Sequence, residues 1–488
     1  MWTIVLKEFR ELLYNPRFLF SAIVAAILIL TSIYNGYSIY QSELENAIAS
    51  EAYALQEAEK TETYQFIELD VVRRPNVLSI FDTGLSGVLG RQGNVETNDE
   101  HPAKVTDSRN EENPVFALFS ELDLTKTVSI VLALFAILFA HSMITAERED
   151  GTLKLIIANS VSRSSILSGK IIGGFVPLAL LLIIPALAGF LALTSFGSIA
   201  FSWNDWFAIT LMVLGFLLYL LVFYLLGLAM SALSRSSFIS LMFCLLFWVL
   251  SVAILPRVAV YAANASSPPV SLFEMEKKLQ TVRNNYSKEW AKKLSDSVNS
   301  KNLTRKQWGE NFRDILNTVR KEMSQLQMER NRKIYEEYYR KRQRLLNTVE
   351  TYSRISPTAS LNHIIHRLAG SGPDMLPGFE EDLERYVDAL TAYSKAKYEE
   401  FYEEEKNKSH GAVGLQLDDD ENGFVTLKSV TGYDQTRVDL SDMPNFRLSE
   451  TSIDSAVNKS LTDFTVLAFF SILFLTLAYT AFIRYDVR

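Results

Sequence analysis

The sequence has almost no cysteine, since Cys244 is the only one among 488 residues. No intrachain disulfide can form, so any domain that this chain places outside a membrane must fold without one. Cys244 lies in an apolar run, where free cysteines are commonly buried as small apolar side chains. We therefore interpret it as a packing residue and not as a redox centre.

Signatures of nucleotide binding and of hydrolysis are also missing. A P-loop needs G-x-x-x-x-G-K-[ST], and the nearest segment, Ser164–Ile171, has serine for the first glycine and isoleucine after the lysine. No nucleophile elbow or zinc-protease signature is present, and no basic stripe with interleaved aromatic residues indicates nucleic acid. We expect a chain that is not an enzyme and holds no catalytic residue, metal or cofactor of its own.

Charge is scarce and unevenly placed. The chain is 48% hydrophobic and only 21% charged, with a charged block between about Ser271 and Lys408. This division is typical of a membrane protein with a large soluble domain. A spanning helix needs about 20 apolar residues. Six runs meet this length and predict uncleaved spans over 18–37, 127–145, 171–195, 207–233, 238–255 and 464–483.

Basic residues predict the orientation of these spans. Short loops rich in lysine and arginine stay in the cytoplasm. If all six runs span, one side of the membrane carries Lys7, Arg10, Arg17, Arg148, Lys154, Arg163, Lys170, Arg235, Arg484 and Arg488, and the loop 197–206 on the other side has no basic residue. We expect a multi-pass protein of a bacterial inner membrane with both termini cytoplasmic, a tail over 484–488, and residues 38–126 and 256–463 extracytoplasmic.

The first outer region and the N-terminus show short periodic patterns. Residues 1–17 carry apolar side chains at helical spacing with charges between them, which predicts an amphipathic helix in the membrane interface, ended by Asn15-Pro16. The first span is expected to continue as a helix to about Glu59. Alternation over 64–72 predicts a strand, and the polar stretch 91–113 predicts a mobile loop.

The second outer region is expected to be mainly helical. Residues 305–353 contain no proline, and their apolar residues step by threes and fours, which predicts one helix of about 70 Å at 1.5 Å per residue. Its stripe needs a partner, for which 272–298 and 379–405 are candidates. Short alternating runs over 411–448 predict a small β element. The predicted fold class is mainly α: a six-helix transmembrane bundle with a large, mostly helical extracytoplasmic domain.

Three isolated motifs have functional and structural interpretations. Asp418–Gly423 resembles the start of a calcium loop, but Ser429 replaces the required glutamate, which favours an acidic hairpin turn. His363 and His366 could share a metal, but no third ligand is evident, so we interpret them as structural surface histidines. His141, inside the second span, is a candidate for the transport path or coupling, against simple interfacial packing.

A charged segment, 146–170, lies between the second and third spans. Its charges are too costly for hydrocarbon, so it must form a loop at one membrane face. Three pieces of it carry a family resemblance: Glu147–Leu153, Ser160–Arg163 and Gly169-Lys170. The chain thereby resembles a permease subunit of the ABC-2 type of ABC transporter, whose motifs read approximately E-R-E-x-G-T-L, N-P-V-S-R and G-K. Ser160 replaces the usual proline.

A narrower resemblance is to permeases with a large outer insert, such as those of nitrous-oxide-reductase and gliding-motility ABC systems. The segments that carry it are scattered but in order: Arg74–Ser79, Leu122–Leu124, Ser356–Ala359, Leu368–Gly370 and Met443–Phe446. By this resemblance two permease subunits, identical or paralogous, pair in the membrane lipid. Two cytoplasmic ABC ATPases, which bind ATP and Mg, would dock beneath them.

The resemblance also implies which residues couple this chain to the ATPase. The segment after Glu147 would be a coupling helix seated in a groove of the ATPase, and Gly151 would permit a close turn out of the second span. The implied coupling residues are Glu147, Arg148, Glu149, Gly151, Thr152, Leu153, Leu155, Ile156 and Arg163.

Two functional hypotheses follow. The first is the permease of an ATP-driven exporter, whose few polar groups in the spans favour an amphiphilic substrate. The second is a mechanotransmission subunit, in which ATP hydrolysis moves the outer stalk, with or without an outer partner protein, and nothing crosses the spans. A secondary transporter is disfavoured because the spans lack paired acidic residues.

Overall fold

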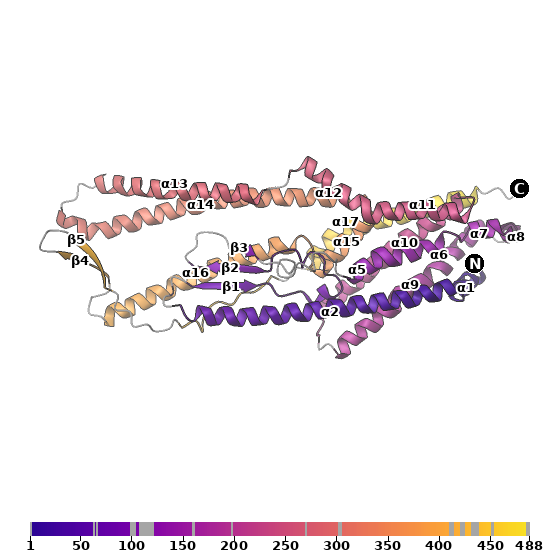
Figure 1. Cartoon of the computed structure of the whole chain (residues 1–488), viewed down its shortest axis with the longest axis horizontal. Coiled ribbons are helices and arrows are strands. Elements are labelled where there is room, and N and C mark those ends of the chain that lie inside the picture. Colours follow the sequence, from indigo (N-terminus) through magenta and orange to yellow (C-terminus); the bar gives the residue numbers. More distant parts are fainter. Residues whose placement is uncertain are drawn as a thin grey trace.

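The computed structural model describes most of the chain and shows an elongated molecule, with the spans at one end and the outer elements extending from them (Figure 1). The described residues are 2–484 except 62–63, 65–66, 98–103, 107–121, 159–161, 197–198, 269–270, 301–304, 409–413, 420–424, 431–438 and 450–452. The fold class is as predicted: mainly α, with six helices long and apolar enough to cross a membrane.

Helix α1 (Trp2–Leu13) ends where the sequence predicts, before Asn15-Pro16. Asn15 then caps α2 (Pro16–Ala58), because its side chain accepts a hydrogen bond from the backbone N–H of Arg17. Proline suits the first turn, where its missing N–H is not needed. The helix continues far beyond the first apolar run, as predicted, and carries the chain out along the outer region (Figure 1).

The second span is broken into pieces. Asp123 caps α5 (Leu124–Lys126) and is followed by a π-helical stretch (η3, Thr127–Leu132) and α6 (Ala133–Ala140). After a turn, α7 (Thr145–Glu149) and α8 (Thr152–Ala158) follow. π-helical turns inside helices commonly mark functional sites.

The other spans are longer than the predicted runs. They are α9 (Arg163–Phe196), α10 (Trp203–Leu233), α11 with η4 and α12 (Ser237–Val249, Leu250–Ile254, Leu255–Ser266) and α17 (Ile453–Ile483). Helix α10 lies at the centre of the bundle, since Tyr219, Phe223 and Tyr224 are fully buried. Pro177 and Pro185 are accommodated inside α9.

The first outer region contains a small antiparallel sheet in the order β1-β2-β3: Glu68–Val72, Gln92–Glu96 and Lys104–Thr106. The predicted loop over 91–113 is therefore wrong for the described residues. The alternation in β2 was easy to miss, because one of its two buried positions is Gly93 and the other is Val95. A Cβ on Gly93 would lie 2.5 Å from Cδ1 of Leu383, so a larger residue would require the Leu383 side chain to shift.

The second outer region begins with a helical hairpin, called the stalk below, in which α13 (Leu272–Ser300) and α14 (Arg305–Ser353) run side by side (Figure 1). The candidate partner 272–298 is confirmed: Ile315, Val319 and Met323 of α14 are buried with Tyr286, Trp290 and Leu294 of α13 around them. The side chains of Trp308 and Phe312, at the start of the predicted stripe, lie outside those the structure describes.

Helix α16 (Met375–Lys408), the other candidate partner, covers the small sheet instead. Its residues Phe379, Leu383, Tyr386 and Leu390 share a buried cluster with Ile67, Leu69, Val71, Val95 and Met443. Strands β4 (Gly414–Asp419) and β5 (Val425–Val430) pair antiparallel and confirm the predicted β element. The turn residues 420–424 lie outside the described part of the chain.

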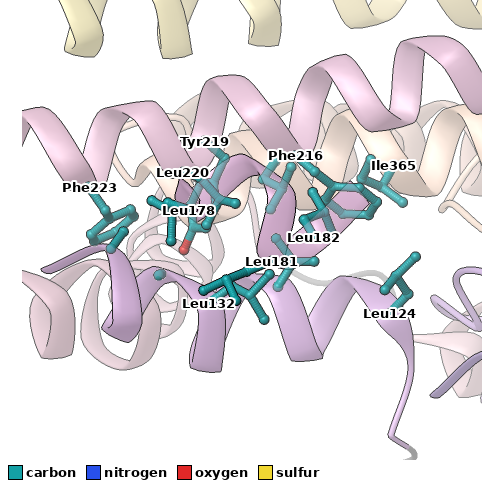
Figure 2. Packing of buried hydrophobic residues seen from close by; sticks show 14 of the residues in the cluster. Leu124, Leu132, Leu178, Leu181, Leu182, Phe216, Tyr219, Leu220, Phe223 and Ile365 are labelled. Carbon is teal, nitrogen blue, oxygen red and sulfur yellow. The ribbon is translucent and has the colours of Figure 1, made fainter. Parts of the chain in front are cut away.

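Helix α15 (Pro357–Ala369) connects the outer region to the spans. Leu361, Ile364, Ile365, Leu368 and Ala369 belong to the same buried cluster as the span residues, and Figure 2 shows Ile365 among side chains of the spans. Its N-terminal end is held by hydroxyl groups. Tyr219 Oη lies 3.0 Å from Thr358 Oγ1 and donates to the Ser129 carbonyl at 2.8 Å, while Ser356 Oγ donates to the Ser251 carbonyl at 2.6 Å.

A buried carboxylate, Asp463 of α17, joins α15 to the base of the stalk. It accepts from Nε of Arg354, the residue that follows α14, at 2.9 Å and from Arg367 of α15 at 2.7 Å, and lies 3.2 Å from His363 Nδ1. Arg367 also donates to Glu350 at 2.5 Å. Because the Asp463 side chain is 0% exposed, this network must stay paired, since a buried unpaired charge is strongly unfavourable.

A second buried pair joins α15 to the first outer region. His366 Nδ1 lies 2.6 Å from Asp82 Oδ2, which also accepts from the Ser371 hydroxyl. Next in the chain, Thr83 donates to Asp123, the cap of the second span, at 3.0 Å. The two histidines of α15 thus bind different carboxylates, and with side chains 15% and 21% exposed they are not surface residues as predicted.

Titration of His366 depends on these neighbours. Burial alone would lower its pKa, but the carboxylates of Asp82 and Asp123 outweigh burial and Lys126, so the pKa is raised. The pKa of Asp82 is lowered despite its burial, because His366 and Ser371 stabilise its charged form.

We expect Asp463→Asn to destabilise the chain by about 3 kcal/mol, because two arginines would lose their buried counter-ion. The matched control is Asp374→Asn. Asp374 pairs with Lys459 at 2.8 Å, and both side chains are more exposed than those around Asp463. This substitution should cost under about 1 kcal/mol. Chemical unfolding in detergent micelles measures both. Equal stability of the two variants would contradict the role assigned to Asp463.

We also expect a pH-dependent contribution from His366. A raised pKa stabilises the fold fully below the unfolded value of about 6.5, and this contribution is lost as pH rises through the folded pKa. The lowered pKa of Asp82 acts at the acidic end, where its contribution is lost as pH falls. The stability difference between wild type and His366→Gln should therefore shrink from pH 6.5 to pH 9, measured by thermal unfolding. A stability difference that is constant across this pH range would contradict the contribution assigned to His366.

Candidate functional site

The predicted coupling residues lie at the end of the bundle where α1 and the end of α17 also lie (Figure 1). Helix α7 continues the second span to Glu149, and the chain then turns at Gly151 into α8. Gly151 has φ 73°, a left-handed conformation that glycine adopts without strain. The turn that the sequence predicted at this glycine is therefore present.

Glu147, Arg148 and Glu149 point to three different neighbours. Successive residues of an α-helix are about 100° apart around its axis, so three in a row face three directions. Glu147 pairs with Lys170 of α9 at 2.7 Å. Arg148 reaches the end of α10, and Glu149 reaches the start of α11. One short helix thus connects three spans.

Arg148 and Glu149 match the polarity of the helix ends that they touch. The last carbonyls of a helix have no intrahelical donor, and Arg148 donates to the Ser234 and Ala232 carbonyls at 2.6 and 3.2 Å. The first N–H groups lack acceptors, and Glu149 accepts from Ser237 N at 2.8 Å and from its hydroxyl at 2.9 Å. Each charge also opposes the helix dipole favourably.

Lys170 is the centre of a buried ionic cluster. The sequence places it in the loop, but it lies inside α9 with its side chain 2% exposed. Its ammonium group has three acceptors: Glu8 Oε1 at 2.9 Å, Glu147 Oε1 at 2.7 Å and the Met143 carbonyl at 3.1 Å. The contacts with Glu8 and the Met143 carbonyl are hydrogen bonds, and the contact with Glu147 is an ion pair, so the buried charge lies between two carboxylates.

Helix α1 is part of this cluster, which sequence reasoning missed. Glu8 is 7% exposed, although it lies between apolar residues on a helix predicted to rest in the membrane interface. Its position three residues after Val5 and four before Leu12, on the apolar stripe, was the available signal. A Cβ on Gly173 would lie 2.8 Å from Glu8 Cβ, so glycine allows α1 to approach α9 closely.

The apolar residues of α8 divide into buried and exposed. Leu153 is fully buried with Ile144, Ile166 and Leu167, and Ile156 packs at the edge of that cluster. Leu155 is 69% exposed, and Thr152 and Lys154 are exposed beside it. Thr152 also donates to the Glu147 carbonyl at 3.3 Å. The surface that α8 presents is therefore centred on Leu155.

The remaining predicted residues lie around this segment. Arg163 begins α9 and donates to the Ile483 carbonyl at the end of α17. Ser160, where the motif departs from the family pattern, lies outside the described residues. His141 is the C-cap of α6, and its Nδ1 lies 3.0 Å from the Leu138 carbonyl of that helix.

Comparison with protein families decides the membership of this chain. The family model described as ABC-2 family transporter protein matches residues 2–320. The chain belongs to this family. The match covers α1, the first five spans and the hairpin helix α13. A second model, a domain of unknown function (DUF3526), matches residues 273–447, which hold the stalk, α15, α16 and the strands β4 and β5. Comparison with curated proteins gives no match.

Membership fixes the general role of this ABC-2 chain. It is a multi-pass membrane subunit of an ABC transporter and not the ATP-binding component, and it works with a cytoplasmic ABC ATPase. The anchored elbow formed by α7, Gly151 and α8, called the coupling elbow below, lies at a membrane face and is attached to several spans at once.

We expect Lys170→Met to lower the free energy of local opening of α1 by about 3 kcal/mol, because Glu8 and Glu147 would lose the buried cation between them. Hydrogen exchange of the α1 amides in the detergent-solubilised protein measures this. Lys7→Met is the control, because Lys7 is half exposed and lies 3.4 Å from Glu147; it should cost under about 1 kcal/mol.

Adding Glu8→Gln and Glu147→Gln to Lys170→Met should restore much of the lost protection, since no buried charge then remains unpaired. Protection of α1 that is unchanged in the single variant would show that the cluster does not hold this helix.

Proposed function

We propose that this chain is the permease subunit of an ATP-driven ABC-2 exporter, and that the coupling elbow receives the motion of the ATPase. Two permeases, identical or paralogous, would pair, with two ATPases that bind ATP and Mg docked beneath them. The observation that supports this most is an exposed apolar residue, Leu155, on an elbow that is fixed to other helices by charge pairs and capped helix ends.

The attachments explain how a push on the elbow would reach the membrane. Glu147 acts on α9 and α1, Arg148 on α10 and Glu149 on α11, while Arg163 joins α9 to α17. Displacing α8 would therefore move the ends of several helices together. Packed bundles respond to such a push as rigid bodies, because their cores are dense and hardly compressible.

The proposed orientation places this end in the cytoplasm, with both termini. Exposed arginines and lysines gather here, among them Arg10, Arg17, Lys154 and Arg235, and basic short loops stay on the cytoplasmic side. The stalk, the sheet and α16 would then be extracytoplasmic, in agreement with a bacterial inner-membrane location.

The proposed substrate is an amphiphile. Most of the side chains that α9, α10 and α17 bury are apolar, and a small ion would need a continuous polar lining. The exposed faces of the span helices, such as those with Ile184, Leu187 and Leu191 on α9, would contact membrane lipid or the second permease.

One observation favours the alternative, mechanotransmission. Helix α15 belongs to the outer region but is buried among the spans, and Asp463 and Asp82 tie it to α14, α17 and the first outer region. Movement of α17 would reach the stalk through charged groups that cannot separate cheaply. ATP-dependent movement of the stalk in liposomes that release no amphiphile would favour this alternative over export.

We expect Leu155→Asp to reduce retention of the ATPase on the purified permease at least about tenfold, because a charge would replace the exposed apolar anchor. The measurement is magnesium-dependent ATP hydrolysis that copurifies with the tagged permease from its own host. Leu272→Asp is the control, since Leu272 is 54% exposed on the stalk.

Replacing 147–155 by a flexible linker should abolish retention. ATPase that stays bound to the linker variant would refute the coupling assignment, and equal loss in Leu272→Asp would show a general defect of the permease.

A further inference from the structure

The π-helical stretch of the fifth span, η4, leaves one backbone carbonyl without a donor from its own helix. The N–H of Leu255 donates to the Leu250 carbonyl, five residues back. In a regular α-helix this N–H would donate to the carbonyl of Ser251, four residues back. The next residue, Pro256, begins α12 and has no N–H that could replace it. The Ser251 carbonyl therefore needs a donor from elsewhere in the bundle.

The N-terminal cap of α15 supplies that donor. Ser356 Oγ donates to the Ser251 carbonyl at 2.6 Å. The same hydroxyl lies 3.3 Å from Ser251 Oγ, which in turn lies 3.1 Å from Thr358 Oγ1. All three residues are at most 3% exposed, so the hydrogen bonds are shielded from competing water. Side chains of α15 thus stabilise the π-helical form of the fifth span.

The second span repeats this arrangement in η3. The N–H of Ala133 donates to the Val128 carbonyl, five residues back, and the carbonyl four residues back, that of Ser129, accepts from Tyr219 Oη of α10 at 2.8 Å. Tyr219 Oη also lies 3.0 Å from Thr358 Oγ1. Buried hydroxyl groups therefore connect the two π-helical stretches through α15. We call this set the hydroxyl chain: Ser129, Tyr219, Thr358, Ser251 and Ser356.

The form of η4 determines which face α12 turns toward the stalk. Helix α12 follows η4 directly and packs against α14 (Figure 1). Its buried residues are Ala259 and Ala263, and after its last turn Ser267 Oγ lies 3.5 Å from Thr348 Oγ1 of α14. A π-helical turn holds one residue more than an α-helical turn. If η4 became α-helical, each residue of α12 would move to the place of the next residue, a rotation of about 100°.

The π-helical and α-helical forms of η4 differ by the exchange of one hydrogen bond. In the α-helical form the Leu255 N–H would donate to the Ser251 carbonyl in place of the Ser356 hydroxyl. Packing also favours the π-helical form, because the α-helical form would place Val258 where the smaller Ala259 is buried now. Packed helices have discrete arrangements and do not deform continuously. The fifth span therefore has two defined forms, of which the structure shows one.

We propose that the hydroxyl chain is a conformational lock between the spans and the stalk. While Ser356 and Thr358 contact Ser251, η4 stays π-helical. When the N-terminal end of α15 moves away, η4 becomes α-helical and α12 slips by one residue along α14. The base of α14 stays in place during this slip, because Arg354 and Asp463 hold it to α17. The proposal does not rest on the export function, since the slip needs neither the ATPase nor a substrate.

Disulfide cross-linking in the full-length chain, purified in detergent, tests the slip. Cys244, the single cysteine, is first replaced by alanine. Under a mild oxidant, Ser267→Cys with Thr348→Cys should form a disulfide at least about tenfold faster than Ser266→Cys with Thr348→Cys. The reason is that Ser267 now lies at Thr348, whereas the Ser266 hydroxyl donates to carbonyls of its own helix. After the slip, residue 266 would occupy the place of residue 267.

Ser356→Gly should raise the cross-linking rate of the pair at 266 and 348 about tenfold, without raising that of the pair at 267 and 348. It removes the donor to Ser251, and one hydrogen bond shifts such an equilibrium by about this factor. Glycine is tolerated at an N-cap. Thr358→Val keeps the Ser356 cap and should act in the same direction.

Ser202→Gly is the matched control, because Ser202 caps α10 and its hydroxyl donates to Asp205 of the same helix. It should leave both cross-linking rates unchanged. An unchanged rate for the pair at 266 and 348 in both Ser356→Gly and Thr358→Val would overturn the proposal. So would a slower reaction at 267 and 348 with no gain at 266 and 348, since α12 would then separate from α14 without slipping. An equal gain in Ser202→Gly would also overturn it.

Discussion

A charge that leaves water must find partners, and in this protein that requirement holds together the end of the bundle that carries α1 and the coupling elbow. The ammonium group of Lys170, on α9, is buried where α1 and α7 meet α9, and its partners are Glu8 of α1, Glu147 of α7 and the Met143 carbonyl in the turn before α7. If one of these acceptors is removed, a buried charge loses its partner, and few other contacts here could offset the loss of stability. The position of α1, the direction of α7 and the turn into α8 all depend on this cluster.

The same requirement operates at the other end of the spans. Asp463 and Asp82 are both fully buried carboxylates, and each has a partner on α15, Arg367 for Asp463 and His366 for Asp82. This short helix has an apolar face that packs among the spans and a charged face that holds the outer region. Buried ion pairs contribute little net stability but fix geometry strongly, because alternative arrangements leave charges unpaired. The chain thus has a rigid connection of buried ion pairs between helices at each end of its bundle, and we call these two connections joints.

These joints connect the outer region mechanically to the bundle. A motion that enters at the coupling elbow can leave through α17 and α15 into the stalk, whichever of the two proposed functions holds.

Much of the architecture could be predicted from the sequence, because its signals are local. Apolar runs of sufficient length determine spans, Asn15-Pro16 determines where α1 ends, and the stepping of Ile315, Val319 and Met323 determines a helix that needs a partner. Gly151 and the E-R-E motif likewise marked the coupling elbow. Strand β2 was missed because glycine at a buried position gives no hydrophobic signal.

What only the tertiary structure decided is which charges meet. Glu8 and Lys170 are 162 residues apart, and Arg354 and Asp463 are 109 apart, so no local pattern relates them. The sequence alone determined that these residues carry charge and lie near apolar segments. Whether each one faces water or a buried partner depends on how the helices pack, because the free energy of a charge is set by its surroundings and not by its neighbours in the chain.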